Sequence, residues 1–235
     1  MTKIIPAILP SSYRAIEDSV EKVHDIVKTI QIDLVDGYFA PNKTWMFNGK
    51  DEDILEKISK EEIGLPYWDS LDYEIDLMAN NPLEKLDQIL ILGPSKIIFH
   101  LESLDEEKTL KYFETIPQIV KETVSFGIAI GVETDPEKVR PYLEYVDTIQ
   151  CMGIEKVGFQ GHPFDPRVID QIKKVRTLFP DKNISVDGAV SLENAKSFVD
   201  AGADSLVVGS SVFHNPDPVG TIEAIEQICQ SVDKI

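Results

Sequence analysis

Short apolar runs alternate with longer amphipathic segments from one end of the chain to the other. A short apolar run bounded by turn residues is typical of a buried strand, and apolar residues spaced by three and four are typical of a helix. In residues 13–28, for example, Ile16, Val20, Val23 and Val27 follow the helical spacing. The alternation predicts repeated strand–helix units around a parallel sheet.

The pattern predicts eight strands and eight helices. We expect the strands over residues 4–9, 29–34, 73–78, 96–100, 127–132, 148–152, 184–186 and 205–208. We expect the helices near residues 13–28, 51–60, 82–92, 105–125, 136–144, 166–179, 191–201 and 217–232.

Both a doubly wound sheet and a TIM barrel alternate strands with helices. The placement of polar residues favours the barrel, because carboxylates and glycines follow the ends of several predicted strands and those ends meet at one mouth of a barrel. The predicted fold class is therefore α/β, a TIM (β/α)8 barrel. Because no Gly/Ser/Pro linker divides the chain, we expect residues 1–235 to form one barrel domain.

The composition narrows the choice of partners. The chain has 23 basic and 41 acidic residues and a net charge of −18. This charge argues against nucleic acid and against anionic membranes as partners. No segment approaches the roughly 18 apolar residues of a membrane span. Cys151 and Cys229 are far apart and suggest neither a zinc site nor a disulfide framework, so we expect a cytoplasmic protein.

Carboxylates occur on the inward faces of several predicted strands. Gln31 and Asp33 share a face by the period of two, and Asp76 and Asp187 hold comparable places on two other strands. A charged side chain inside a barrel is costly unless it is paired, ligated or functional. A cap or a turn would explain any one of them, but several at equivalent strand ends indicate a site.

Asp33 and Asp187 lie within motifs that resemble the ribulose-phosphate 3-epimerase family across nearly the whole chain. The motifs are, in order, IPAIL at 5–9, DLVDGYFAPN at 33–42, FHLE at 99–102, GFQGHPF at 158–164, VDG at 186–188 and AGADSLVVGS at 201–210. The resemblance implies an isomerase that epimerises a phosphorylated ketose through a metal-stabilised enediolate. It also implies that Asp33 and Asp187 are the catalytic acid and base, one on each face of a planar intermediate.

The chain departs from the family at both metal-binding histidines. Gln31 and Asp76 stand in their places, and Ala7 replaces a serine of the first strand. In one interpretation Gln31, Asp33, Asp76 and Asp187 form an all-oxygen metal site that favours Mg²⁺ or Mn²⁺ over Zn²⁺. In the other the metal is absent, the carboxylates repel one another and at least one pKa rises. We favour the first, because a cation removes the repulsion.

The resemblance also assigns the phosphate and substrate contacts. The expected phosphate-binding residues are Gly158, Gly161, Gly188, Ala189, Gly209 and Ser210. The expected substrate pocket contains Ala7, Met78, His100, Met152 and His162. In the 158–164 segment, Gln160 replaces a family glycine and His162 a family glutamine. The glycines could instead serve only as turn residues, but their occurrence after the last two strands favours phosphate binding.

Two other functions remain open. One is a lyase or decarboxylase of the same phosphate-binding barrel group, and the other is a non-catalytic homologue that binds a sugar phosphate. The segment from Ile63 to Leu71 is longer than the resemblance predicts. We expect its Tyr67 and Trp68 to pack against the barrel, with an oligomer contact as the alternative, and we expect a homo-oligomer.

Overall fold

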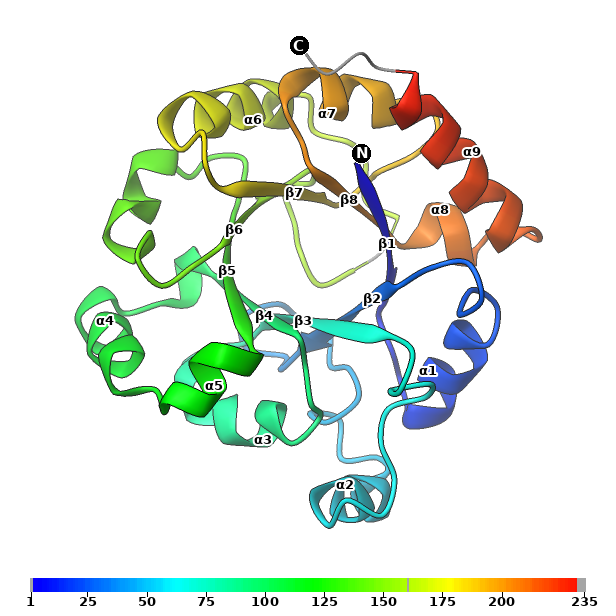
Figure 1. Ribbon diagram of the computed structural model, residues 1–235, viewed down its shortest axis with the longest axis vertical. Coiled ribbons are helices and arrows are strands. Elements are labelled where there is room, and N and C mark those ends of the chain that lie inside the picture. The colour runs from blue at the N-terminus through cyan, green and yellow to red at the C-terminus, as the bar shows by residue number, and fades with distance from the viewer. Residues whose placement is uncertain (1, 160, 232–235) are drawn as a thin grey trace.

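A computed structural model describes residues 2–159 and 161–231. Within these residues eight parallel strands pair in chain order and close into a barrel, as Figure 1 shows in a view down its axis. The strands are β1 (Lys3–Ile8), β2 (Thr29–Val35), β3 (Asp72–Met78), β4 (Lys96–His100), β5 (Ser125–Ile130), β6 (Thr148–Met152), β7 (Asn183–Asp187) and β8 (Ser205–Val208). The predicted TIM barrel is confirmed.

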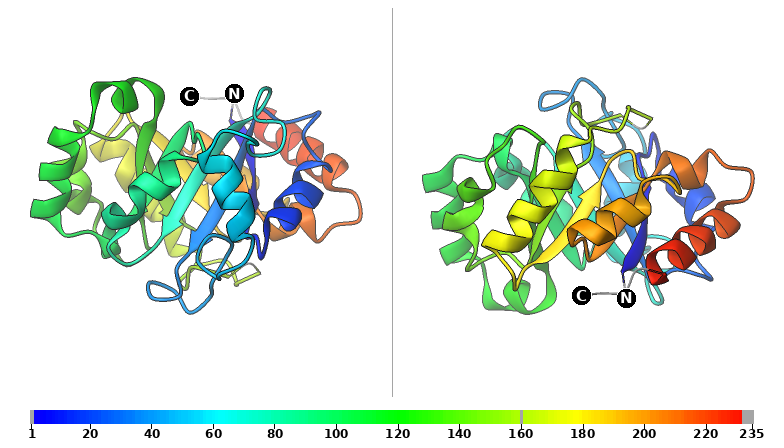
Figure 2. Two further views of the ribbon diagram at one scale, coloured as in Figure 1. Left: turned by 90° about the horizontal axis from the view of Figure 1, so that it is seen from below. Right: turned by 90° about the horizontal axis from the view of Figure 1, so that it is seen from above.

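The helices form an outer layer around the strands (Figures 1 and 2). The α-helices are α1 (Tyr13–Val20), α2 (Glu52–Ser59), α3 (Leu86–Leu90), α4 (Glu106–Thr115), α5 (Gln118–Thr123), α6 (Arg167–Leu178), α7 (Ala195–Ala201), α8 (Ser210–Phe213) and α9 (Pro218–Gln230). The 3-10 helices are η1 (Pro82–Lys85), η2 (Leu101–Ser103) and η3 (Pro136–Tyr142). No helix among the described residues is long and apolar enough to cross a membrane.

Proline accounts for two differences from the predicted helices. The helix predicted over 105–125 is divided into α4 and α5 at Pro117, because proline lacks the amide hydrogen of a helix interior and disfavours helical backbone in the residue before it. The segment predicted over 136–144 is the 3-10 helix η3, which contains Pro141. The predicted end of the last helix at residue 232 lies outside the described residues.

The hydrophobic pattern also predicts the boundaries of one helix and one strand incorrectly. The helix predicted over 13–28 ends at Val20, although Val23 and Val27 are buried in the turns that follow. Their burial explains the helical spacing without a helix. The strand predicted over 127–132 is β5, which begins two residues earlier at Ser125 and ends at Ile130.

Strand register sets which side chains meet inside the barrel. Asp33 of β2 is paired with Asp76 of β3, and Met152 of β6 with Asp187 of β7. Because side chains alternate along a strand, Gln31 lies on the same inward face as Asp33. The register therefore brings polar side chains from distant parts of the sequence to one level of the barrel.

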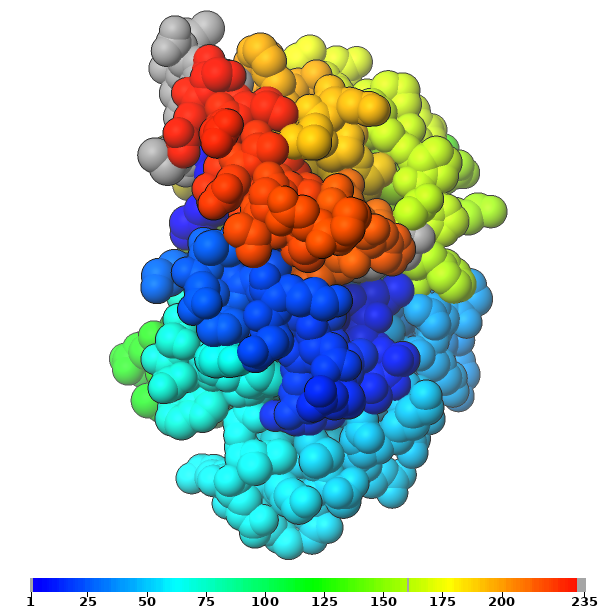
Figure 3. Space-filling model, turned by 90° about the vertical axis from the view of Figure 1, so that its right-hand side faces the viewer, coloured from blue at the N-terminus to red at the C-terminus, as the bar shows by residue number. Residues whose placement is uncertain are grey.

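The segment from Ile63 to Leu71 leads from α2 back to β3, and α2 lies at the edge of the molecule (Figures 1 and 3). Tyr67 is 37% exposed, and its ring stacks on His24 of the segment after α1, at 3.9 Å between centroids, rather than against the barrel. The prediction is wrong for Trp68, which is 70% exposed. A large aromatic side chain at the surface is a common feature of interfaces, so the oligomer contact stays a prediction.

An aromatic cluster joins α4 to the barrel. The ring of Phe113 lies 5.4 Å from that of Phe126 and 5.2 Å from that of Tyr145, and it also contacts Phe99. The side chain of Phe113 is almost completely buried. This packing fixes the helix that follows β4, far from the mouth residues named above.

We predict that Phe113→Ala lowers the free energy of unfolding by about 3–5 kcal/mol, since it removes a buried ring and leaves a cavity. Urea unfolding followed by circular dichroism measures the change. The matched control is Ile119→Ala on α5, where the side chain is 65% exposed and the change should stay within about 0.5 kcal/mol. Equal losses in the two variants would contradict the assigned packing.

Candidate functional site

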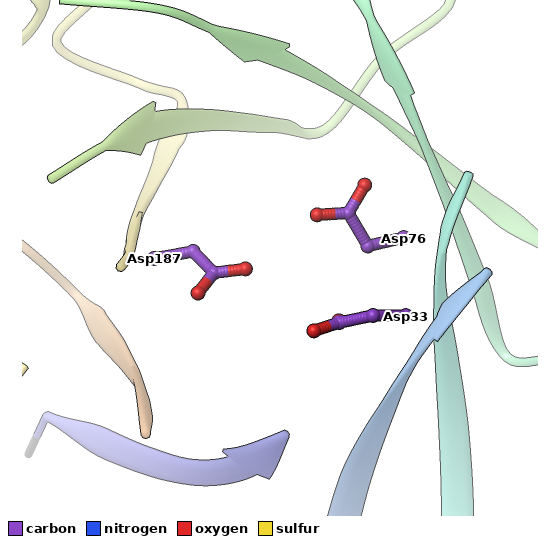
Figure 4. A group of neighbouring side chains, drawn as sticks. All are labelled: Asp33, Asp76 and Asp187. Atoms are coloured by element: carbon purple, nitrogen blue, oxygen red, sulfur yellow. The ribbon is translucent and has the colours of Figure 1, made fainter. Parts of the chain in front are cut away.

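Three aspartates meet inside the barrel near the carboxyl ends of the strands. Asp33 comes from β2, Asp76 from β3 and Asp187 from the end of β7, and all three are buried. One carboxylate oxygen from each lies within 4.8 Å of the others. Figure 4 shows Asp187 facing Asp33 and Asp76 across the barrel. The sequence-predicted grouping of these side chains is therefore present in the fold.

Two glutamine amides connect the aspartates. Gln31 Nε2 donates to Asp33 Oδ1 at 2.8 Å and to Asp187 Oδ2 at 2.8 Å. Gln150 Nε2 donates to Asp76 Oδ2 at 3.0 Å and lies 3.4 Å from Asp187 Oδ2. Hydrogen bonds to charged acceptors are stronger than neutral ones, so these amides offset part of the repulsion among the carboxylates.

A histidine supports the third aspartate. His100 Nε2 lies 2.9 Å from Asp76 Oδ1, and both side chains are buried. Burial by itself lowers the pKa of His100, but the charge of Asp76 and the hydrogen bond to it outweigh burial, so the pKa is raised. A protonated His100 would add a positive charge beside the group.

Burial and mutual repulsion raise the pKa values of two of the carboxyl groups. Burial, then the charges of Asp187 and Asp76, hold the pKa of Asp33 well above its usual range. Burial and the charge of Asp76 raise the pKa of Asp187 to about 7, although the hydrogen bond from Gln31 acts in the opposite direction. Near neutral pH, Asp33 and Asp187 therefore hold protons more tightly than ordinary carboxyl groups do.

The donor set fits a hard divalent cation. Carboxylate oxygens are the ligands that Mg²⁺, Mn²⁺ and Ca²⁺ prefer, and one from each aspartate is available here. The Oε1 atoms of Gln31 and Gln150 are buried and have no hydrogen-bond partner in the described residues. An amide can be turned to present either its nitrogen or its oxygen, so these atoms could also serve a cation. The structure therefore supplies three buried carboxylates that could bind a metal ion, and the further ligands stay a prediction.

A pocket opens above Asp33 and Asp187. Most of the sequence-predicted phosphate and substrate residues line it: Ala7, Met78, Met152, Gly158, Gly161, His162, Gly188, Ala189, Gly209 and Ser210. The other predicted site residues, Gln31, Asp76 and His100, are not among the lining residues and lie buried around the aspartates. The predicted replacement Gln160 lies outside the described residues.

The loops after β7 and β8 line the part of the pocket that comes from the C-terminal segments of the chain. The loop after β7 contains Ala189, whose φ of 55° lies in the left-handed region that residues with a side chain seldom adopt. Ser211, in the first turn of α8 after β8, donates from Oγ to the carbonyl oxygen of Val190 at 2.6 Å. The two loops are thus held together, and unusual backbone of this kind is frequent at ligand sites.

The loop after β6 covers the pocket from the opposite direction. Figure 2 shows it, in yellow-green, projecting at the same end of the barrel as the loop after β2, in blue. Asn42 Nδ2 of the latter donates to the carbonyl oxygen of Gly158 at 3.1 Å. Gly158 has a φ of +89°, and a Cβ atom there would lie 2.5 Å from Cβ of Ala40. This contact requires glycine.

Sequence reasoning missed Gln150 and several apolar residues of the pocket. The apolar ones are Leu9, Ile154, Val157, Phe159, Val190 and Val207. A signal for Gln150 was present, since it lies two positions before Met152 and therefore on the same inward face of β6. A glutamine in an otherwise buried strand needs a hydrogen-bonding partner, as the aspartates do.

The family follows from a comparison of the sequence. The family model described as ribulose-phosphate 3 epimerase family matches residues 3–213, nearly the whole chain. The chain belongs to the ribulose-phosphate 3-epimerase family. Relatives named ribulose-phosphate 3-epimerase include one from Schizosaccharomyces pombe, 27% identical over 95% of this chain and 92% of the relative. Another, from Chlamydia muridarum, is 28% identical over 94% of this chain and 92% of the relative.

Solved structures share the fold of this epimerase-family chain. One is 3-keto-L-gulonate-6-phosphate decarboxylase from Vibrio cholerae, with a TM-score of 0.72, 10% identity and 99% coverage of both chains. Another is 3-hexulose-6-phosphate synthase from Salmonella typhimurium, with a TM-score of 0.68, 17% identity, and coverage of 97% of this chain and 99% of that one. At such identities the likeness concerns the fold.

We predict that the stability of the chelator-treated protein falls as pH rises from about 4 to about 7. In this window the folded protein holds a proton on Asp187, with a pKa of about 7, that the unfolded chain has already lost. The stabilisation is complete below about pH 4 and declines by roughly 1.4 kcal/mol per pH unit up to the folded pKa. Urea unfolding in EDTA across this range measures the slope.

Asp187→Asn should flatten this slope and raise stability at pH 8, because it removes a charge from the buried group. The control is Asp200→Asn on the surface of α7, which should leave the slope unchanged. A slope in Asp187→Asn as steep as in the unmodified protein would contradict the assigned burial and repulsion.

We predict that Gly158→Ala destabilises the folded protein more than Gly161→Ala does. Both glycines have positive φ, so both variants introduce backbone strain. Among the described residues, however, only the Cβ at 158 meets a neighbour, and none lies within 4 Å of a Cβ at 161. Urea unfolding of the two variants compares the losses. Equal losses would show that the close approach of Gly158 to Ala40 is relieved without cost.

Proposed function

We propose that this chain epimerises a phosphorylated ketose by moving a proton between Asp33, Asp187 and the substrate carbon. The observation that carries the proposal is the position of these two aspartates. They come from β2 and β7, face each other across the barrel, and both line the same pocket. Inversion of a stereocentre through a planar enediolate needs one proton-transferring group on each face, and this arrangement supplies both.

The raised pKa values support different roles for the two aspartates, one as the base and the other as the acid. Buried carboxyl groups that repel each other share protons, so that one is protonated while the other is ionised. The ionised carboxylate removes the proton from one face of the substrate carbon, and the protonated carboxyl returns a proton on the other face. Without a cation, the pKa of Asp187 is about 7, so both of its protonation states are accessible at neutral pH.

Asp33, Asp76 and Asp187 would hold a divalent cation, with the Gln31 oxygen as a further ligand. We propose Mg²⁺ or Mn²⁺ rather than Zn²⁺, since all the donors are oxygens. Such a cation supplies electrostatic stabilisation of the negative oxygen of the enediolate. His100 orients Asp76 through its hydrogen bond, as partners of ligating carboxylates commonly do.

The loops after β7 and β8 are proposed to bind the substrate phosphate. Gly188, Ala189, Gly209 and Ser210 line the pocket beside Asp187, and Gly158 and Gly161 close it from the β6 loop. Loops at this place in a TIM barrel present backbone amides to phosphate. Because the protein is strongly acidic, local dipoles must supply the attraction. The remaining pocket contacts are assigned to Ala7, Met78, Met152 and His162.

Relatives named ribulose-phosphate 3-epimerase make a ribulose phosphate the first substrate to test. We further propose that residues 1–235 act as one barrel domain in the cytoplasm, in keeping with a relative named as a cytoplasmic isoform. The exposed Trp68 supports the expectation of a homo-oligomer.

The proposed activity predicts that purified protein with Mg²⁺ or Mn²⁺ exchanges the C3 proton of ribulose 5-phosphate with solvent deuterium. Asp33→Asn and Asp187→Asn should each slow inversion at C3 by about 10²–10⁴-fold, the usual contribution of general acid–base catalysis, because inversion needs both groups. Nuclear magnetic resonance of the sugar follows the exchange and the inversion. The matched control is Glu74→Gln, which neutralises a buried carboxylate two positions before Asp76 in β3, where it pairs with Lys96 and is not among the residues that line the described pocket.

Other products would identify the alternative functions. Release of CO₂ or of two carbon fragments from a ketose phosphate would indicate a lyase or decarboxylase. Binding of a sugar phosphate with no exchange in any ketose phosphate tested would indicate a non-catalytic homologue and would overturn the proposed epimerase.

A further inference from the structure

Gln150 occupies the centre of the buried polar group and has no part in the reaction described above. It lies in β6 with no exposed surface, and its Nε2 reaches Asp76 Oδ2 and Asp187 Oδ2. Gln31 makes the corresponding bridge between Asp33 and Asp187. The two amides together join all three carboxylates into one chain of hydrogen bonds.

Each of these amides uses only half of its hydrogen-bonding capacity. Oε1 of Gln150 and Oε1 of Gln31 are buried, and neither has a partner in the part of the chain that the structure describes. A buried carbonyl oxygen without a partner costs about 1–3 kcal/mol. A second arrangement in which both oxygens find a positive partner would remove that cost, while the amide nitrogens would lose their carboxylate acceptors.

An amide exchanges its oxygen and nitrogen by rotation about its last torsion angle, which has a broad, nearly two-fold preference. Turned in this way, Oε1 of Gln150 would face Asp76 and Asp187. The two carboxylates and the turned amide oxygen are all negative or partly negative, so this arrangement is stable only with a cation among them. The arrangement in the structure, with the amide nitrogen facing the carboxylates, needs no cation. The charge at the centre of the group therefore decides the orientation.

We propose that Gln150 is a cation-responsive positioning residue: its amide nitrogen holds Asp76 and Asp187 together without a cation, and its Oε1 turns to a divalent cation when one binds. The inference rests on the proposed cation at the three aspartates and extends the site to β6. An amide suits both states because it is neutral and offers a donor and an acceptor. Glutamate would add a fourth negative charge, and leucine would leave the carboxylates without the donor.

The effect of Gln150 on cation affinity has opposite signs under the two possible roles. If its oxygen turns to the cation, removal of the amide weakens binding. If the amide only donates to the carboxylates, it competes with the cation, and removal strengthens binding or leaves it unchanged. The sign of the change therefore tests the proposal directly.

Gln150→Met keeps the length of the side chain but replaces the amide with a thioether, which hard cations bind poorly. We expect isothermal titration with Mg²⁺ and with Mn²⁺ to give an affinity about 10-fold or more below that of the unmodified protein. The matched control is Gln171→Met. Gln171 is also buried, its Nε2 donates to the carbonyl oxygens of Gly131 and Thr134, and its Oε1 likewise lacks a described partner. Its affinity should stay within about twofold.

Unchanged or tighter binding by Gln150→Met overturns the proposal and leaves the proposed epimerase intact. If the unmodified protein binds neither ion, both the cation site and the proposal fail. The deuterium exchange of the same preparation then shows whether epimerisation survives without a cation.

A second measurement uses the unmodified protein and covers the case in which Gln150→Met does not fold. A crystal structure with Mn²⁺ locates the ion by its anomalous scattering. The proposal expects Oε1 of Gln150 in direct contact with the ion. An ion bound to the three aspartates while Nε2 of Gln150 still donates to Asp76 and Asp187 overturns it.

Discussion

The structure depends on holding the carboxylates of Asp33, Asp76 and Asp187 together inside a closed barrel. Their oxygens lie within 4.8 Å of one another, and at that limit two like charges repel each other by roughly 3 kcal/mol at the effective dielectric constant of protein sites. The rest of the barrel can move little to relieve this, since each aspartate lies on a strand that is paired on both sides. The relief comes from amide donors, from protons retained on Asp33 and Asp187, and, in the proposed active state, from a cation. Each of these reduces the same repulsion, so they compete for the same oxygens.

This competition connects the electrostatics to the proposed chemistry. A carboxyl group that holds its proton to about pH 7 is suited to return a proton to a substrate, and an ionised partner across the mouth is suited to remove one. The same burial that raises these pKa values also removes water from the site and strengthens every remaining electrostatic contact. The pocket above the aspartates is formed largely by loops after β1, β6, β7 and β8, so the barrel supplies the charged floor and the loops would supply the proposed phosphate contacts. TIM-barrel enzymes commonly combine a rigid barrel with loops at its mouth that present backbone amides to the ligand.

Much of this arrangement was predictable from local sequence patterns, and the errors of the prediction have local causes. The strands were found because a buried parallel strand is a short apolar run, and the carboxylates were assigned inward because side chains alternate along a strand. The prediction of one helix over 105–125 is wrong at Pro117, because the spacing of apolar residues carries no information about a missing amide hydrogen. Gln150 was overlooked because an amide carries no charge, although its burial makes the same demand for partners.

The sequence by itself determined the barrel, the inward face of each strand and the family, because periodicity, turn residues and motif order are properties of short segments. It also determined that Gln31 and Asp76 stand at the two positions where the family resemblance implies metal-binding histidines. Only the tertiary structure decided which side chains touch, since Gln150 and Asp76 are 74 positions apart and meet through barrel closure. The raised pKa values of Asp33 and Asp187, the pairing of His100 with Asp76 and the exposure of Trp68 were likewise decided there. Burial and distance arise from packing among all the strands, and no single segment contains them.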